Sequence, residues 1–190
     1  MQGIKLGYAL TGSFCTFEKS LAEMQKLKEA GFDIVPIMSY NAYSLDTRFG
    51  KAEDFVKRIE EISERKVIAT ITDAEPVGPA KLTDVMVVLP CTGNTLAKLA
   101  SGIYDTPVTL AVKSHLRNQR PVIIGVSSND SLSSAAKNIG ILLNNKHYYF
   151  IPMKQDDPDK KPFSVVCDFS LVKDTIEAAL YGKQHQPILI

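Results

Sequence analysis

Four short segments rich in hydroxyl and amide side chains each come directly after an apolar run of the sequence. Hydroxyl groups, together with the free backbone N–H groups at the start of a helix, are common donors to a bound phosphate. A glycine in such a segment lets the backbone approach a ligand closely. The sequence therefore predicts a site for a phosphate-bearing cofactor, made from Thr11, Gly12, Ser13, Ser39, Pro90, Cys91, Thr92, Gly93, Asn94, Thr95, Ser127, Ser128 and Asn129.

Each segment by itself also has an ordinary structural explanation, because Ser, Thr and Gly are common in turns and at helix N-termini. Cys91 is either a ligand contact or a small buried residue, and the second role is the more common one. The coincidence of four such segments favours a binding site. The sequence contains neither the Gly-x-Gly-x-x-Gly pattern of dinucleotide-binding folds nor the Gly-x-x-x-x-Gly-Lys-Ser/Thr pattern of a P-loop.

The histidines and cysteines predict no metal centre. His115, His147 and His185 share no metal-ligand spacing with a cysteine or a carboxylate. His115 stands among lysines and arginines, so we expect it on a solvated basic face. The three cysteines form no Cys-x-x-Cys pair and are an odd number, which is typical of a reducing compartment. The sequence assigns no catalytic residue.

The order of elements along the chain predicts how these segments come together. Apolar runs predict strands, and amphipathic stretches between them predict helices. This alternation is typical of an α/β fold, so we expect a three-layer, doubly wound parallel sheet of the flavodoxin or Rossmann type. Ligands of such sheets bind at the carboxyl ends of the strands. The predicted strands are 4–10, 32–38, 85–89, 121–126 and 148–151; the predicted helices are 16–30, 54–63, 94–101, 107–118, 131–144 (broken near Gly140) and 168–181.

Length and composition are those of an ordinary globular chain. We expect residues 1–190 to form one domain, with 183–190 as a tail that is exposed or pinned to a neighbouring subunit. Loops are expected at 73–80 and 152–162, and a short strand or a helix tail at 67–71. A net charge of +1 gives no reason to expect nucleic acid or an anionic membrane as a partner. The chain shows no signal peptide and no apolar run long enough for a membrane span, so we expect a cytoplasmic protein.

Residues 90–105 resemble a motif of the flavin-binding cysteine decarboxylase superfamily. Members carry Pro-Ala-Ser/Thr-Ala-Asn-Thr followed by Leu-Ala-Lys-x-Ala-x-Gly-x-x-Asp, and this chain has Pro-Cys-Thr-Gly-Asn-Thr followed by Leu-Ala-Lys-Leu-Ala-Ser-Gly-Ile-Tyr-Asp. The turn Thr11-Gly12-Ser13 is similar to the phosphate-binding turn of the family. The resemblance implies flavin mononucleotide (FMN) as cofactor and a homo-oligomer built from trimers, with flavin sites at subunit interfaces.

Residues 125–130 and 151–158 resemble one branch of this superfamily, in which the flavoprotein is the second subunit of a two-subunit oxidoreductase. The resemblance implies a partner, the A subunit, which holds NAD(P), and oxidation of a dihydrodipicolinate-type intermediate to dipicolinic acid in sporulation. Either the flavin or the partner's nicotinamide accepts the hydride. A small dicarboxylate substrate requires Lys or Arg, and Lys154 is the candidate contact.

The chain also departs from the superfamily pattern. The catalytic histidine of the decarboxylases is missing from residues 73–81, and the chain has no tryptophan for their substrate clamp. Decarboxylation of a cysteine is therefore not expected. Activity as a flavin prenyltransferase is disfavoured because the predicted strand-end segments lack Arg and Lys. The main alternative is a non-catalytic protein with a relic flavin site, which stabilises or activates the A subunit.

Overall fold

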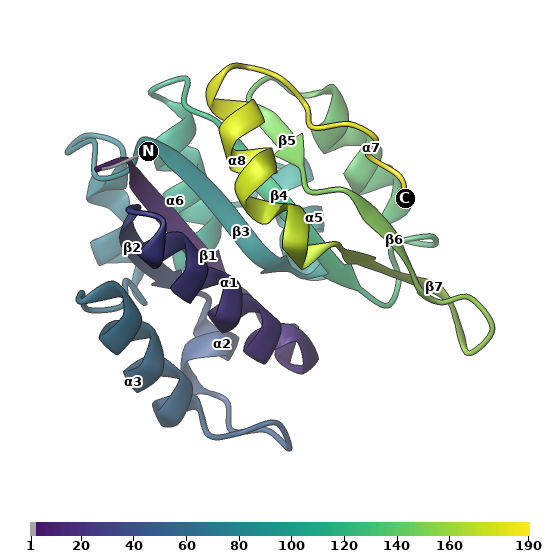
Figure 1. Cartoon of the computed structure of the whole chain (residues 1–190), viewed down its shortest axis with the longest axis horizontal. Coiled ribbons are helices and arrows are strands. Elements are labelled where there is room, and N and C mark those ends of the chain that lie inside the picture. The colour runs from purple at the N-terminus through teal and green to yellow at the C-terminus, as the bar shows by residue number, and fades with distance from the viewer. Residues whose placement is uncertain (1–2) are drawn as a thin grey trace.

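The computed structural model describes residues 3–190, so residues 1 and 2 of the predicted domain lie outside the described residues. Figure 1 shows a central sheet with helices packed against it. The strands are β1 (Lys5–Leu10), β2 (Asp33–Met38), β3 (Val85–Cys91), β4 (Val122–Ser128), β5 (Tyr148–Phe150), β6 (Met153–Asp157) and β7 (Lys161–Cys167). The α-helices are α1 (Phe17–Glu29), α2 (Tyr40–Ser44), α3 (Ala52–Ser63), α4 (Ile71–Ala74), α5 (Gly93–Ala100), α6 (Pro107–Leu116), α7 (Ala136–Asn144) and α8 (Val172–Leu180), and the 3₁₀ helices are η1 (Phe14–Thr16), η2 (Glu75–Val77) and η3 (Phe169–Leu171). Within residues 3–190, no helix has the length and apolar character to cross a bilayer.

Five parallel strands form the body of the sheet, in the order β2-β1-β3-β4-β5. This is the strand order of flavodoxin-like folds, in which the chain winds first to one side of β1 and then to the other. The predicted doubly wound α/β fold is therefore confirmed. The winding reverses between β1 and β3, which is the position where such sheets bind ligands.

Two separate apolar cores lie on the two faces of the sheet, because successive side chains of a strand point in opposite directions. Leu6 and Tyr8 of β1 belong to the core under α1, α3 and α8, whereas Ala9 belongs to the core under α5, α6 and α7. Figure 1 shows α1 and α8 in front of the sheet and α5 and α6 behind it. All seven residues of β3 are buried between these layers, which gives the strand ends a rigid base.

The polar segment 152–162, expected as a loop, contains most of an antiparallel hairpin formed by β6 and β7. Ser127 and Ser128 at the end of β4 pair with Val166 and Val165 of β7, so the hairpin extends the sheet beyond the parallel strands. The loop prediction was wrong because it used polarity alone. An outer hairpin tolerates polar residues, since antiparallel strands need only one covered face and charged residues are common on edge strands.

Two strands also run further than predicted. Pro90 and Cys91 continue β3, and Ser127 and Ser128 continue β4, although all four were expected just beyond a strand. Proline ended the predicted strand because it lacks an N–H, but its carbonyl still accepts a hydrogen bond from the backbone N–H of Thr11 (3.2 Å). The end of β4 is held by β7, a partner that was not predicted.

Helices differ from their predicted bounds mainly at one end. The helix expected over 131–144 begins only at Ala136, as α7, and continues through Gly140 without a break. The segment 73–80, expected as a loop, contributes to α4 and η2. Residue Ile68, in the ambiguous stretch 67–71, makes a single parallel bridge to Ile37 of β2.

The segment 183–190 packs against its own chain rather than extending freely. The backbone N–H of Met153 donates to Ile188 (2.9 Å), and that of Ile190 donates to Met153 (3.2 Å). The side chain of Gln184 bonds both the N–H and the carbonyl of Phe150. Leu189 is nevertheless 72% exposed. The segment therefore lies along the outer edge of β6 with part of its apolar surface in solvent.

His115 is fully buried, which contradicts the prediction of a solvated position. Its Nε2 donates to the carbonyl of Pro121 (3.1 Å), and its Nδ1 accepts from the hydroxyl of Thr83 (2.7 Å). One donor and one acceptor on the ring are the pattern of a neutral imidazole. Burial lowers the pKa of His115 to about 4, and the nearby Arg120 also lowers it. The basic neighbours in the sequence were misleading because α6 turns His115 inward.

We expect His115 to make the fold sensitive to mild acid. An unfolded histidine titrates near pH 6.5, so the unfolded chain binds the proton more readily than the folded one between about pH 6.5 and 4. The contribution of His115 is present at neutral pH and declines by about 3 kcal/mol as the pH falls through this window. Urea unfolding of the wild type and of His115→Gln at pH 7 and pH 4.5 measures the contribution of His115 to the free energy of unfolding. A stability difference between the two proteins that does not shrink at the lower pH would contradict this expectation.

Candidate functional site

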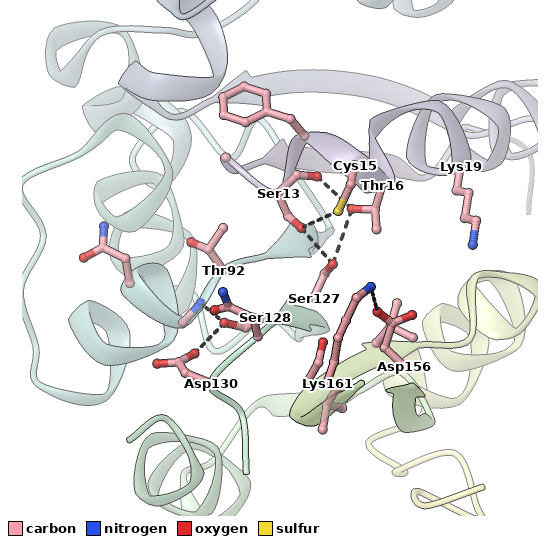
Figure 2. A pocket seen from close by; sticks show the side chains of 18 of the residues that line it. Ser13, Cys15, Thr16, Lys19, Thr92, Ser127, Ser128, Asp130, Asp156 and Lys161 are labelled. Carbon is pink, nitrogen blue, oxygen red and sulfur yellow. Dashed lines mark hydrogen bonds and ion pairs between the residues drawn. The ribbon is translucent and has the colours of Figure 1, made fainter. Parts of the chain in front are cut away.

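A cavity of about 930 Å³ opens where β1, β3 and β4 end. Figure 2 shows polar side chains from these three strand ends directed into it. Volumes of 300–1,000 Å³ are typical of sites for cofactors and other small ligands. The lining residues are Gly12, Ser13, Phe14, Cys15, Thr16, Lys19, Arg48, Phe49, Thr92, Gly93, Asn94, Ser127, Ser128, Asn129, Asp130, Asp156, Lys161, Ser164, Val165 and Val166.

The turn after β1 and the end of β4 are joined by hydroxyl groups. Ser13 Oγ lies 2.9 Å from Ser127 Oγ, and Thr16 Oγ1 lies 3.4 Å from the same atom (Figure 2). Thr16 also donates to the carbonyl of Ser13 (2.8 Å), which fixes the turn. The turn leads through η1 into α1. The first amides of such a helix lack intrahelical acceptors, and they give this corner a positive potential.

A second hydrogen-bond network joins the start of α5 to the residues that follow β4. Thr92 caps α5 by accepting from the N–H of Thr95 (3.3 Å). The N–H of Gly93 donates to Ser128 Oγ (3.1 Å), and Ser128 in turn donates to Asp130 (2.6 Å). Hydrogen bonds from Ser128 and then Ser134 lower the pKa of Asp130. Asp130 is therefore an ionised anchor for this corner of the cavity.

The third wall of the cavity is basic and aromatic. Lys161 of β7 pairs with Asp156 of β6 at 2.6 Å. Lys19, on the first turn of α1, reaches towards the same side of the cavity, as Figure 2 shows. Arg48 stacks over the ring of Phe49, with 4.8 Å between its Cζ and the ring centroid. Within residues 3–190, neither Lys19 nor Arg48 forms an ion pair.

The cavity brings together eight of the residues predicted from the strand ends. These are Gly12, Ser13, Thr92, Gly93, Asn94, Ser127, Ser128 and Asn129. Four others lie beneath its floor. Thr11 donates to the carbonyl of Pro90 (2.8 Å), Cys91 is fully buried, and Thr95 Oγ1 lies 3.1 Å from the capping oxygen of Thr92. Burial raises the pKa of Cys91, so its thiol is neutral and does not serve as a nucleophile.

The remaining two predicted residues have other roles and do not line the cavity either. Ser39 caps α2, where its side chain accepts from the N–H of Ala42 (3.3 Å). Lys154 lines a separate, mainly apolar groove between α7, β6 and the C-terminal segment. Its neighbours Met153 and Gln155 line the same groove, whereas Asp156, beyond an irregularity in the pairing of β6 with β7, lines the cavity.

Sequence reasoning missed two kinds of lining residue. Asp130 follows Asn129 directly and Thr16 follows Ser13 by three residues, so a wider window around each strand end finds them. Lys19, Arg48 and Lys161 come from a helix face, a loop and an unpredicted hairpin. Only the tertiary structure brings them to one cavity.

Comparison with known proteins places the chain in a family. Residues 1–177 match the model of the family named Flavoprotein. The chain belongs to the flavoprotein family. It is 42% identical to the B subunit of dipicolinate synthase from Bacillus subtilis (strain 168) over 190 residues, which is 100% of this chain and 95% of that protein.

Solved flavoprotein structures share the fold. The crystal structure of the dipicolinate synthase B subunit from Bacillus halodurans C matches with a TM-score of 0.91 and 40% identity, over 100% of this chain and 97% of that one. The FMN-dependent cysteine decarboxylase SpaF matches with a TM-score of 0.70 and 22% identity, over 93% of this chain and 97% of that one. The likeness to the B subunits therefore extends over the whole chain in both sequence and structure.

Proposed function

We propose that this chain is the flavin-binding subunit of a two-subunit dipicolinate synthase. The observation that carries the proposal is the polar cavity at the reversal point of the sheet, in a chain 42% identical over its length to a B subunit of that enzyme. In this proposal the two subunits oxidise a dihydrodipicolinate-type intermediate to dipicolinic acid during sporulation. NAD(P) binds to the A subunit, and this chain forms a homo-oligomer built from trimers.

The residues around the cavity fit FMN. A phosphate needs N–H and hydroxyl donors, and the turn Gly12–Thr16 with Ser127 offers both beside the start of α1. Thr92, Gly93 and Asn94, at the start of α5, and Ser128 and Asn129 offer further polar groups for the edge of the flavin ring. The only carboxylates that line the cavity within the described residues are Asp130, which is held by serines, and Asp156, which is paired with Lys161.

A bound flavin supplies an acceptor or donor for a hydride, and the chain supplies position and electrostatics. Burial keeps the Cys91 thiol neutral, and Asp130 is ionised and hydrogen-bonded, so neither is a suitable general acid. The described residues of the cavity include no histidine. The absence of a histidine from the cavity fits the absence of the decarboxylase histidine from residues 73–81, and transfer of a hydride to or from a flavin does not require one.

A second candidate function is a non-catalytic partner of the A subunit. The fully neutral hydroxyl network favours it, because Ser13, Thr16 and Ser127 satisfy one another without a ligand. In that case the cavity is a relic of a flavin site, and this chain acts by stabilising the A subunit.

Titration of the purified full chain with FMN, followed by flavin absorbance, distinguishes the two candidates. We expect saturable binding of about one FMN per chain. Co-expression with the A subunit tests the reaction itself, since dipicolinate formation should require both chains. A protein that binds no FMN but still stimulates the A subunit supports the second candidate. Full dipicolinate formation by either chain without the other would overturn both.

A further inference from the structure

The three basic residues of the cavity come from different parts of the chain: Lys19 from α1, Arg48 from the loop between α2 and α3, and Lys161 from β7. Thr16 is the N-cap of α1, and Lys19 follows it by three residues, in the first turn of the helix. Lys161 is the first residue of β7 and lies across the cavity from Lys19. Figure 2 shows Lys19 and Lys161 approaching the same space from α1 and β7, while Asp130 lies at the far corner, beside α5.

The surroundings of Lys19 agree with its position on the side of the cavity near β7. Cys167 of β7 is buried, and burial raises its pKa to about 12, while the charge of Lys19 lowers it slightly. The helix η3, which begins two residues after Cys167, contacts α1, the helix that carries Lys19. The ammonium group of Lys19 has no ion-pair partner within residues 3–190.

Arg48 adds a second cation and an aromatic surface. Its guanidinium stacks on Phe49, and Phe14 lines the same cavity. A planar guanidinium can bind a carboxylate through two parallel hydrogen bonds. Lys161 is already engaged by Asp156 at 2.6 Å, so Lys19 and Arg48 are the cations available to a ligand.

We propose that Lys19 and Arg48 bind the carboxylates of a planar dicarboxylate substrate, on the side of the cavity opposite the start of α5. The inference rests on the proposed function, because it places the substrate beside a flavin in the same cavity. Two cations next to aromatic rings suit a flat ring with two negative groups. This assignment replaces Lys154, which faces the other groove.

The phosphate of FMN is also an anion, so the test must separate the two ligands. The full chain is titrated calorimetrically with pyridine-2,6-dicarboxylate, with and without FMN, and separately with FMN. Pyridine-2-carboxylate is the one-carboxylate comparison. The variants are Lys19→Gln and Arg48→Gln, singly and together, and Lys154→Gln is the matched control because it removes a lysine outside the cavity.

We expect each single variant to weaken binding of the dicarboxylate by about fivefold and the double variant by more than about tenfold, as loss of exposed charge-assisted contacts predicts. Lys154→Gln should bind like the wild type, and FMN affinity should change less than about threefold in all variants. The preference for two carboxylates over one should fall in the Lys19 and Arg48 variants.

Three results would overturn the inference. They are a wild type that does not bind the dicarboxylate with or without FMN, a double variant that binds it normally, and variants that lose FMN affinity while dicarboxylate binding is unchanged. In the last case the cations serve the cofactor, and the proposed function stands. A wild type that binds no FMN counts against the proposed function alone, since the dicarboxylate titrations without FMN still decide the roles of Lys19 and Arg48.

Discussion

Gly93→Ala is expected to weaken FMN binding by at least about tenfold while the protein stays folded. A Cβ at this position lies 2.4 Å from Asp130 Oδ1 and 2.8 Å from Ser128 Oγ. Both atoms belong to the network that holds the start of α5 against the end of β4, so the side chains must move and the Gly93–Ser128 hydrogen bond is lost. Loss of about 1.4 kcal/mol of binding free energy corresponds to tenfold in affinity.

The effect on stability should be much smaller than the effect on binding. Alanine favours a helix over glycine by up to about 1 kcal/mol, which offsets part of the steric cost at the start of α5. FMN titration and urea unfolding of the same preparation separate the two effects. Gly140→Ala is the matched control, since its Cβ meets no atom within 4 Å in α7. Wild-type FMN affinity in Gly93→Ala would show that this network does not shape the flavin site.

Gly78→Ala is expected to cause the largest loss of stability of any single methyl added to this chain's glycines. Its Cβ lies only 1.9 Å from the carbonyl oxygen of Ser114, which is backbone of α6 and cannot rotate away. The N–H of Gly78 also donates to Ser114 Oγ (2.8 Å), and its carbonyl accepts from Asn118 (2.8 Å). Relief of the clash must separate η2 from α6 and strain both hydrogen bonds.

The expected cost is about 3 kcal/mol, at the upper end of overpacking changes. For a chain of this size it corresponds to a decrease of roughly 6–12 °C in Tm. Calorimetry compares the Tm of Gly78→Ala, where the added methyl clashes with backbone, with the Tm of Gly140→Ala, where it meets no atom. Because Gly78 has an ordinary helical φ of −79°, backbone strain does not contribute. An unchanged Tm would mean that η2 can separate from α6 at little cost.

The sequence predicts the parallel part of the fold well, because buried strands such as β3 are continuous apolar runs between helical patterns. It predicts the hairpin of β6 and β7 poorly, since polar residues at a sheet edge have the composition of a loop. His115 shows the same limit within a helix. Its neighbours in the sequence are basic, yet α6 packs it against Thr83 and Pro121, which lie elsewhere in the chain.

The site was predictable to the extent that it depends on strand ends. Ser13, Asn94 and Ser128 converge because parallel strands end at one edge of the sheet. Ser39 also follows a strand, but its hydroxyl is used locally to cap α2. Lys19 and Lys161 carry no local signal, because a lysine on a helix or at the tip of an outer hairpin is usually solvated. Only the tertiary structure, which brings the first turn of α1 and the start of β7 to one cavity, gives them a common position.

Two walls of the cavity differ in how firmly they are tied to the parallel sheet: the hydroxyl-rich wall at the strand ends, and the wall formed by the hairpin of β6 and β7. The hydroxyl-rich wall stands at the ends of β1 and β4, two strands whose residues are almost all buried, so changes in this wall disturb the sheet. The hairpin wall is attached to β4 through only two residue pairs, Ser127 with Val166 and Ser128 with Val165. Ser127 and Ser128 also line the cavity, so the hairpin meets the hydroxyl-rich wall at these two residues, whereas Asp156 and Lys161 can change without altering a residue of that wall. The basic side of the cavity can therefore vary in charge at less cost to the sheet than the hydroxyl-rich side.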